Sequence, residues 1–350
     1  MLTSLLFVFS LALLVLGAEM LVRGASRLAV ALGVSPLVIG LTIVALATSA
    51  PELAVSLQAV YANEADIALG NIVGSNILNL LLVVGLSAMI IPLTIHLQLI
   101  RLDLPIMIGV SLLGWLFALS GSVNRWEGLA LAALMAGYIW LQVHLSMKEK
   151  QERETGETSA RRHSWLFNLV LIAAGLALLV LGARWLVESS VTFARHLGVS
   201  EVIIGLTIVA IGTSLPKLIT ALIAALRGER DLAVGNVVGS NIFNILCVLG
   251  ITASLAPGDV AVDPQVLRLD MPVMLGASLL ALPLFFTGKT MARWEGALFV
   301  GLYIAYSCYL VFAATNSPLL SSFASVMLYA AIPAVCLVVA VTTLREQRRS

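Results

Sequence analysis

One stretch of this chain occurs twice, and both copies set polar residues inside long apolar runs. Residues 40–53 read GLTIVALATSAPEL and residues 205–218 read GLTIVAIGTSLPKL, identical at ten of fourteen positions. Residues 68–79 read ALGNIVGSNILN and residues 233–244 read AVGNVVGSNIFN, identical at nine of twelve. The second copy follows the first at a constant offset of 165 residues. The chain is therefore expected to consist of two related halves.

The composition places these repeats in a membrane. Hydrophobic residues make up 60% of the 350 residues and charged residues only 11%, and the mean hydropathy is +1.04. Such values are typical of a polytopic membrane protein. The net charge of +1 and the lack of a basic stripe argue against nucleic acid as a partner. The three cysteines lie in apolar runs and are expected to pack without forming disulfides.

The hydropathy predicts eleven spans, since a helix needs about 20 apolar residues to cross a bilayer. The first is expected to be a retained span, because no basic residue precedes it and no cleavage pattern follows it. The predicted spans are 2–21, 35–62, 66–93, 103–121, 126–146, 164–190, 199–226, 230–256, 269–288, 294–315 and 319–343.

The repeat extends beyond the central segments, through LGVS (residues 32–35 and 197–200), RLD (101–103 and 268–270) and RWEG (125–128 and 293–296). Each half thus has five spans, and because five is odd the second half enters the membrane in the opposite direction. The fold class is an all-α membrane protein with two inverted five-helix repeats and an extra C-terminal span. The expected domains are 1–147, a linker at 148–163, 164–315, and the extra helix at 319–343.

The bias of basic residues predicts the orientation. With residues 148–163 in the cytoplasm, most Lys and Arg residues fall on the inner side. We therefore expect a cell-membrane protein, plasma or inner, with its N-terminus outside and its C-terminus in the cytoplasm.

The first repeat gathers oxygen atoms near the middle of its second span. Thr48, Glu52 and Ser56 share one helix face, and Ser49 is adjacent to Thr48. Pro51 lies inside that span, and Pro216 takes its place in the second repeat. Each proline removes a backbone hydrogen bond and is expected to break its helix, which frees a carbonyl oxygen to act as a cation ligand.

The next span adds amide and hydroxyl groups. Asn71, Ser75 and Asn79 lie on one face, and Gly70 and Gly74 permit close helix packing. Sites made only of oxygen atoms suit hard cations such as Na⁺ and Ca²⁺. Each of these residues alone is typical of helix packing, whereas their duplication favours an ion site.

Other polar residues receive simpler interpretations. Asp103 and Asp270 lie beside Arg101 and Arg268 at span ends, so we expect exposed or interfacial pairing there. The histidines near span ends have no second ligand at metal-binding spacing.

The two motifs resemble the alpha repeats of the sodium/calcium exchanger branch of the cation/calcium antiporter superfamily. The resemblance covers spans 2, 3, 7 and 8 closely and the ten-span layout as a whole. It implies that spans 1 and 6 slide past a core and that ions bind between spans 2, 3, 7 and 8. The implied ligands, transferred position by position, are the backbone oxygens of Ala45 and Ala210, with Thr48, Glu52, Ser75, Asn79, Thr213 and Ser240; Ser49 and Ser214 are adjacent hydroxyls, and Glu52, Thr48 and Thr213 are the expected metal ligands.

Two positions depart from the family pattern. Lys217 stands where the family usually repeats the glutamate, and Asn244 stands where some members have aspartate. One carboxylate therefore faces an ammonium group, which puts Ca²⁺ selectivity in question.

The expected function is a secondary-active cation antiporter that works by alternating access, with Na⁺ as substrate and Ca²⁺ as the family's default counter-ion. One alternative is a Na⁺/H⁺-type or Ca²⁺-independent exchanger in which Lys217 titrates or replaces a bound ion. Another is a membrane scaffold that does not transport. No nucleophile–base pair or phosphate loop is recognisable, so we expect no enzyme and no cofactor besides the transported Na⁺ and Ca²⁺ or H⁺.

Overall fold

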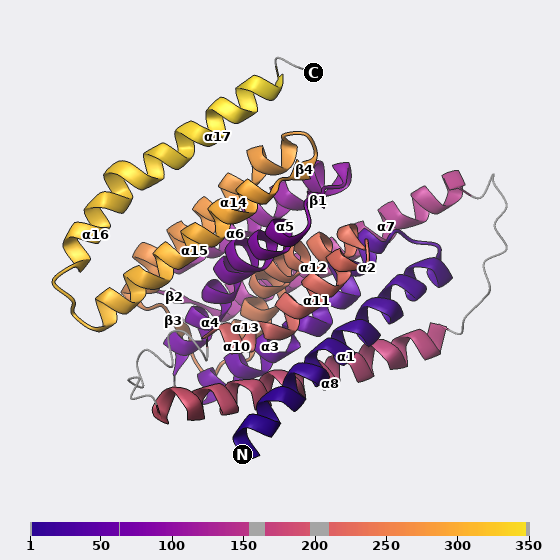
Figure 1. Ribbon diagram of the computed structural model, residues 1–350, viewed down its shortest axis with the longest axis horizontal. Helices are drawn as coiled ribbons and strands as arrows, with labels where there is room; N and C mark the ends of the chain where they lie inside the picture. The colour runs from indigo at the N-terminus through magenta and orange to yellow at the C-terminus, as the bar shows by residue number, and fades with distance from the viewer. Residues whose placement is uncertain (1, 63, 154–164, 197–209, 348–350) are drawn as a thin grey trace.

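The computed structural model describes residues 2–62, 64–153, 165–196 and 210–347 as a bundle of long helices (Figure 1). Within these residues, ten helices are long and apolar enough to cross a membrane. They correspond to ten of the eleven predicted spans. The seventh span, predicted at 199–226, is described only from Ala210 onward, and its last part is the apolar helix Leu215–Leu226.

The first half contains five spans, several of which include a π-helical turn where one extra residue enters a helical turn. Its elements are α1 (Leu2–Leu32), α2 (Pro36–Ile39), a π turn (Gly40–Val44), α3 (Ala45–Tyr61), α4 (Ala65–Leu78), a π turn (Asn79–Val84), α5 (Gly85–Ile90), β1 (Leu93–Thr94), a π turn (Leu99–Asp103), α6 (Leu104–Ala118), β2 (Ser122–Val123) and α7 (Arg125–Arg153).

The second half repeats this order, and its π turns fall at equivalent positions. Its elements are α8 (Trp165–His196), α10 (Ala210–Thr213), α11 (Leu215–Leu226), α12 (Arg230–Phe243), a π turn (Asn244–Leu249), α13 (Gly250–Leu255), β3 (Val260–Ala261), a π turn (Val266–Asp270), α14 (Met271–Phe286), β4 (Thr290–Met291) and α15 (Arg293–Ala314). The extra span is α16 (Leu320–Val326), a π turn (Met327–Ala331) and α17 (Ile332–Gln347).

The two halves pack with two-fold symmetry, as the inverted repeat requires. Strand β1 pairs with β4, and its counterpart β3 pairs with β2, so each short sheet joins one strand from each half. The two sheets lie at opposite ends of the bundle (Figure 1). The helix crossings are symmetric too: Gly85 packs on Gly296, and their equivalents Gly250 and Gly128 pack on each other.

The repeated RWEG segment begins a span in each half because its glutamate caps the helix. Glu127 accepts a hydrogen bond from the backbone N–H of Asn124 at 2.8 Å. Glu295 accepts the equivalent bond from Ala292 at 2.7 Å. A carboxylate three residues into a helix satisfies an N–H that has no partner in the helix, so these motifs fix where α7 and α15 start.

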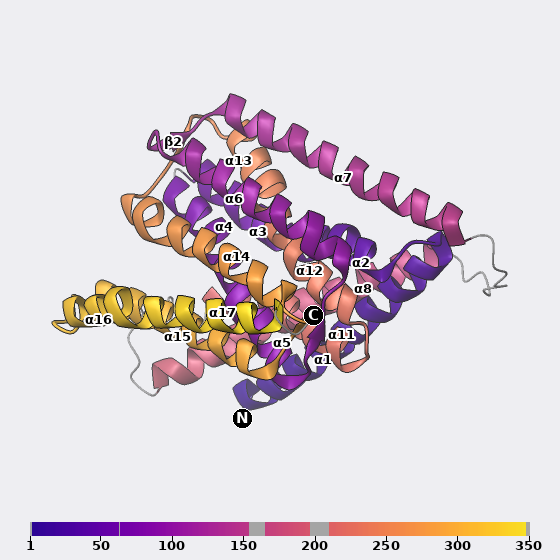
Figure 2. The same cartoon turned by 90° about the horizontal axis from the view of Figure 1, so that it is seen from above.

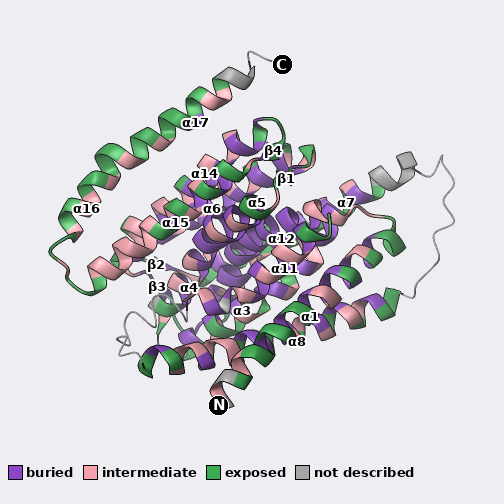
Figure 3. Cartoon of the chain, viewed as in Figure 1, coloured by how far each residue is buried: buried purple, intermediate pink, exposed green. Residues whose placement is uncertain are grey.

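Helix α12 lies at the centre of the bundle, and all but its first two residues are buried (Figure 3). Glycines allow the helix of the second span to approach it closely. A Cβ atom on Gly239 would lie 2.6 Å from the carbonyl oxygen of Leu41, and one on Gly235 would lie 2.9 Å from that of Leu37. These are the second-repeat equivalents of Gly74 and Gly70, whose symmetry-related neighbours lie outside the described residues.

Helix α1 is longer than the predicted span 2–21 and continues to Leu32. Hydropathy alone predicts that the span ends where charged residues begin, but in the structure these charges form ion pairs. Glu19 pairs with Arg23 one turn away and with Arg227 at the end of α11. Helix α8 crosses α1 in the antiparallel sense at Gly17 and Gly175.

The interpretation of two span-end aspartates as partners of the neighbouring arginines is not supported. Asp103 is fully buried and accepts hydrogen bonds from Tyr138 at 3.1 Å and from Gln142. Asp270 accepts the equivalent bond from Tyr306 at 2.9 Å. Each aspartate joins two consecutive spans of its own half. Hydrogen bonds from neutral donors stabilise a buried carboxylate, so no arginine is required.

Candidate functional site

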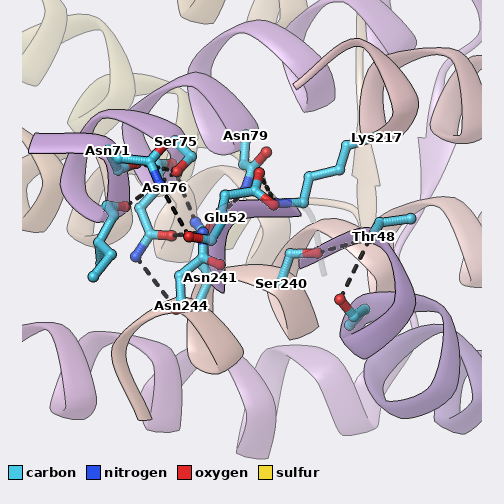
Figure 4. A network of polar contacts seen from close by, with 12 residues as sticks. Thr48, Glu52, Asn71, Ser75, Asn76, Asn79, Lys217, Ser240, Asn241 and Asn244 are labelled. Carbon is cyan, nitrogen blue, oxygen red and sulfur yellow. Dashed lines mark hydrogen bonds and ion pairs between the residues drawn. The ribbon is translucent and has the colours of Figure 1, made fainter. Parts of the chain in front are cut away.

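Glu52 of α3 and Lys217 of α11 form an ion pair in the centre of the protein (Figure 4). The Nζ atom of Lys217 lies 2.5 Å from Oε1 of Glu52, and both side chains are almost completely buried. The two residues are 165 positions apart, so they occupy the same place in the two repeats. The two-fold axis brings these equivalent positions together. Because one repeat has Glu and the other has Lys, the two side chains carry opposite charges.

Thr48 connects the second span to α12. Its hydroxyl lies 2.9 Å from Oδ1 of Asn236, 2.9 Å from the carbonyl oxygen of Val44, and 3.4 Å from the hydroxyl of Ser240. Thr48 and Ser240, both predicted as site residues, are therefore neighbours. One hydroxyl proton cannot serve all these oxygens, so the cluster is rich in acceptors.

Four asparagines form a symmetric network across the axis (Figure 4). Asn76 and Asn241 each donate to the other's backbone carbonyl at 3.3 Å. Asn79 donates to Oδ1 of Asn241 at 3.0 Å, and Asn244 donates to Oδ1 of Asn76 at 2.9 Å. With each amide N–H₂ occupied, the oxygens of Asn79 and Asn244 are left buried and without a partner in the described structure.

The prolines do not act alike. Helix α3 runs through Pro51 without interruption, so the prediction of a break there is wrong. One lost hydrogen bond does not end this helix, which is anchored by a buried face that includes Thr48, Glu52 and Ser56. Pro216 lies in the first turn of α11, and the chain leaves the helix at Ser214, where φ is −98° and ψ is 1°. The second repeat therefore has a genuine interruption beside the ion pair.

Four predicted residues remain, two with described contacts and two without described side chains. Ser75 donates to the carbonyl of Asn71 in its own helix, and the carbonyl of Ala45 lies 3.4 Å from the Thr48 hydroxyl. Ala210 and Thr213 belong to α10, but their side chains lie outside what the structure describes.

Several buried oxygens around the ion pair have no hydrogen-bond partner among the described residues. They are Oε2 of Glu52, Oγ of Ser49 and Ser214, and Oδ1 of Asn79 and Asn244. A buried acceptor without a partner is destabilising, and a bound cation would satisfy several acceptors at once. The unpartnered acceptors named here are all oxygen atoms, which fits a hard cation such as Na⁺.

A cavity of about 340 Å³ leads to Glu52 from one side. It lies between α3 and α8 and is lined by Pro51, Glu52, Arg184 and Glu188, among others. On the symmetry-related side, α1 is joined to the end of α11 by the Glu19–Arg227 ion pair and to the start of α12 by a 2.6 Å hydrogen bond from Ser26 to Glu229. The described residues therefore differ between the two sides: a cavity reaches Glu52 beside α8, whereas an ion pair and a hydrogen bond join the elements on the other side.

Sequence reasoning did not single out Asn76, Asn236 or Asn241. The available signal was the repetition of all three asparagines of the NxxGSNxxN segment in both halves. Arg184 and Glu188 were also missed. Two opposite charges one helical turn apart are typical of a pair at the membrane interface, and only the structure shows the cavity beside them.

Two symmetry-related helical repeats around a buried polar cluster, with a cavity that reaches it from one side, form an arrangement typical of secondary transporters. Comparison with known proteins agrees. The sequence model described as "Sodium/calcium exchanger protein" matches residues 2–144 and 167–312. The chain belongs to the sodium/calcium exchanger family and is a cation antiporter of that family.

Individual relatives match over most of their length. "Inner membrane protein YrbG" of Escherichia coli is 36% identical over 87% of this chain and 96% of its own. "Sodium/calcium exchanger MaX1" of Methanosarcina acetivorans is 33% identical over 86% and 96%. The solved structure of the sodium-calcium exchanger NCX_Mj soaked without Na⁺ and Ca²⁺ has a TM-score of 0.73 at 32% identity, over 87% of this chain and 97% of that one.

Proposed function

We propose that this antiporter carries monovalent cations, Na⁺ first among them, and that Lys217 acts as a fixed cation in place of one transported ion. The observation that carries the proposal is the buried contact between Lys217 and Glu52. In the empty site the ammonium group neutralises the carboxylate, so the protein does not need a bound ion to keep Glu52 buried.

The same contact disfavours Ca²⁺. A cation that shares Oε1 of Glu52 at an ordinary ligand distance of about 2.4 Å would lie within about 5 Å of Nζ of Lys217. At an effective dielectric constant of about 20, one unit charge at that distance costs about 3 kcal/mol, and a divalent ion costs twice as much. Na⁺ can overcome this repulsion with the unpartnered oxygens more readily than Ca²⁺, the family's default counter-ion.

We propose the ligands as Glu52, Thr48, Ser49, Ser75 and Asn79 from the first repeat and Thr213, Ser214, Ser240 and Asn244 from the second, with the backbone oxygens of Ala45 and Ala210. The one-sided cavity supports alternating access, in which α1 and α8 shift together to close the α3–α8 gap and open the α1–α11 contact. Division into repeats 1–147 and 164–315 with a linker at 148–163 remains part of this proposal.

A second candidate is proton exchange. Lys217 is fully buried, and Glu52 is its one anionic partner among the residues that the structure describes, so an entering cation that takes Glu52 would leave the ammonium group uncompensated. Loss of the Lys217 proton to the aqueous side would then couple cation uptake to proton release.

The test is ion flux in proteoliposomes with Na⁺, Ca²⁺ and pH gradients imposed separately. The fixed-cation proposal expects Na⁺ counterflow that is insensitive to Ca²⁺ and moves few protons. Proton release that matches Na⁺ uptake would support the second candidate instead. Rapid Ca²⁺ uptake driven by a Na⁺ gradient would overturn both.

We further propose that the chain lies in the cell membrane with its N-terminus outside and its C-terminus in the cytoplasm, on the strength of its basic residues. The exposed residues Lys289 and Asn316 fall on opposite sides in this orientation. After removal of Cys247, Cys308 and Cys336, an impermeant thiol reagent applied outside intact cells should label Asn316→Cys and not Lys289→Cys. The reverse pattern would invert the topology.

A further inference from the structure

A large apolar cavity lies between the extra C-terminal span and the second repeat, and its lining includes none of the proposed ion ligands. Its volume is about 560 Å³, and its walls come from α14, α15 and the α16–α17 helix. Figure 2 shows the α16–α17 helix on the outside of the bundle, on the opposite side from α7. The family match ends at residue 312, before this helix begins. The cavity therefore depends on a segment that the family match does not include.

The cavity has one polar end and one apolar end. Arg268 and Tyr309 line it near the start of α14 and the end of α15, and Gly276, Leu280 and Val335 line it further along. From Arg268 to Leu280 the helix rises about 18 Å, at about 1.5 Å per residue. This is close to half the hydrocarbon thickness of about 30 Å, so the cavity has the length of one leaflet.

Arg268 is available to a ligand. In the part of the chain that the structure describes, no ion pair reaches it, and the side chain is exposed. The nearby carboxylate of Asp270 accepts its bond from Tyr306. A guanidinium group at the mouth of an apolar cavity, at the depth where lipid headgroups lie, is suited to a phosphate group.

We propose that this cavity binds one anionic phospholipid, with its phosphate on Arg268 and an acyl chain lying along α14 toward the middle of the membrane. The adjoining groove of about 680 Å³ between α14 and α17 supports the choice of an acyl chain, because it shares Gly276, Leu280 and Cys336 with the cavity and lets the chain extend. The bound lipid fills the space between the extra helix and the core.

The two-fold symmetry provides matched controls for both parts of the site. Arg101 is the equivalent of Arg268, and Gly109 is the equivalent of Gly276. Within the described ranges, the α16–α17 helix packs on α14 and α15 and not on α6 of the first repeat. A Cβ atom on Gly276 or on Gly109 meets no other atom within 4 Å, so a leucine fits at either position and fills the cavity only at Gly276.

The experiment is native mass spectrometry of the purified full chain, incubated with phosphatidylglycerol or phosphatidylcholine of identical acyl chains. The wild-type chain should retain one phosphatidylglycerol with about a fivefold preference, the effect of one basic residue near a lipid surface. Arg268→Gln should lose the preference, and Gly276→Leu should lose the bound lipid, while Arg101→Gln and Gly109→Leu behave as wild type. Thermal unfolding checks that all four variants are folded.

Two results would overturn the proposal. One is an unchanged preference in Arg268→Gln or unchanged retention in Gly276→Leu. The other is efficient oxidative cross-linking of Cys336 between two chains in the membrane, which would show that a second copy covers the groove.

Discussion

Replacing Lys217 by glutamine isolates the effect of the ammonium group on cation binding. Glutamine removes the positive charge and keeps a similar shape. With an ion about 5 Å from Nζ, the repulsion removed is about 3 kcal/mol for Na⁺ and about 7 kcal/mol for Ca²⁺. These values correspond to about two hundredfold and up to about 10⁵-fold in affinity, so selectivity should move strongly toward Ca²⁺.

The same substitution leaves the Glu52 carboxylate buried without its partner. Breaking a buried ion pair in this way costs about 3–5 kcal/mol, and a bound cation should recover that stability. The thermal stability of Lys217→Gln should therefore fall in cation-free buffer and rise with added Na⁺ or Ca²⁺, whereas the wild-type chain should respond weakly to Ca²⁺. Lys217→Glu should bind Ca²⁺ at least as tightly as Lys217→Gln.

The assay is thermal unfolding of purified protein across a cation titration, together with radioactive Ca²⁺ binding. The control is the double variant Glu52→Gln/Lys217→Gln, which has a neutral pair and should show no cation-dependent stability. The reasoning is refuted if Lys217→Gln binds Ca²⁺ within about threefold of wild type and unfolds at the same temperature in the absence of cations.

Three further outcomes are expected. Glu52→Gln should abolish coupled transport in proteoliposomes while the protein elutes as a folded monodisperse species, because the substitution removes the carboxylate ligand. Arg227→Gln should increase thiol labelling of Thr220→Cys from the α11 end by up to about fivefold. The partly exposed ion pair between Arg227 and Glu19 contributes about 1 kcal/mol or less to closure of that side. Unchanged labelling would show that this ion pair does not help to close it. Gly239→Ala should lower the unfolding temperature markedly because its Cβ would strike the Leu41 carbonyl, whereas Gly301→Ala, in open space, should not.

The sequence alone predicted the ten spans that the structure describes in full and the inverted relation of the two halves. Hydropathy and an odd count of spans per repeat are enough for both, because the bilayer fixes helix length and parity fixes direction. It also determined that Glu52 and Lys217 are equivalent, since the repeat offset is constant. The boundary of α1 was not predictable, because Arg23, just beyond the predicted end at residue 21, looks like the end of a span until the structure shows its ion pair with Glu19, which Arg227 joins from more than 200 residues away.

The tertiary structure decided how the polar residues are used. Asn79 and Asn244 were predictable as site residues. Only the crossing of α4 and α12 shows that the amide N–H₂ groups of Asn79 and Asn244 donate to Asn241 and Asn76, so that the side-chain oxygens of Asn79 and Asn244 have no partner among the described residues. Which side of the site is open could not be read from two nearly identical motifs, because a symmetric sequence permits both states. The asymmetry arises from how α1 and α8 pack on the core, and packing between distant segments leaves no local signal in the sequence.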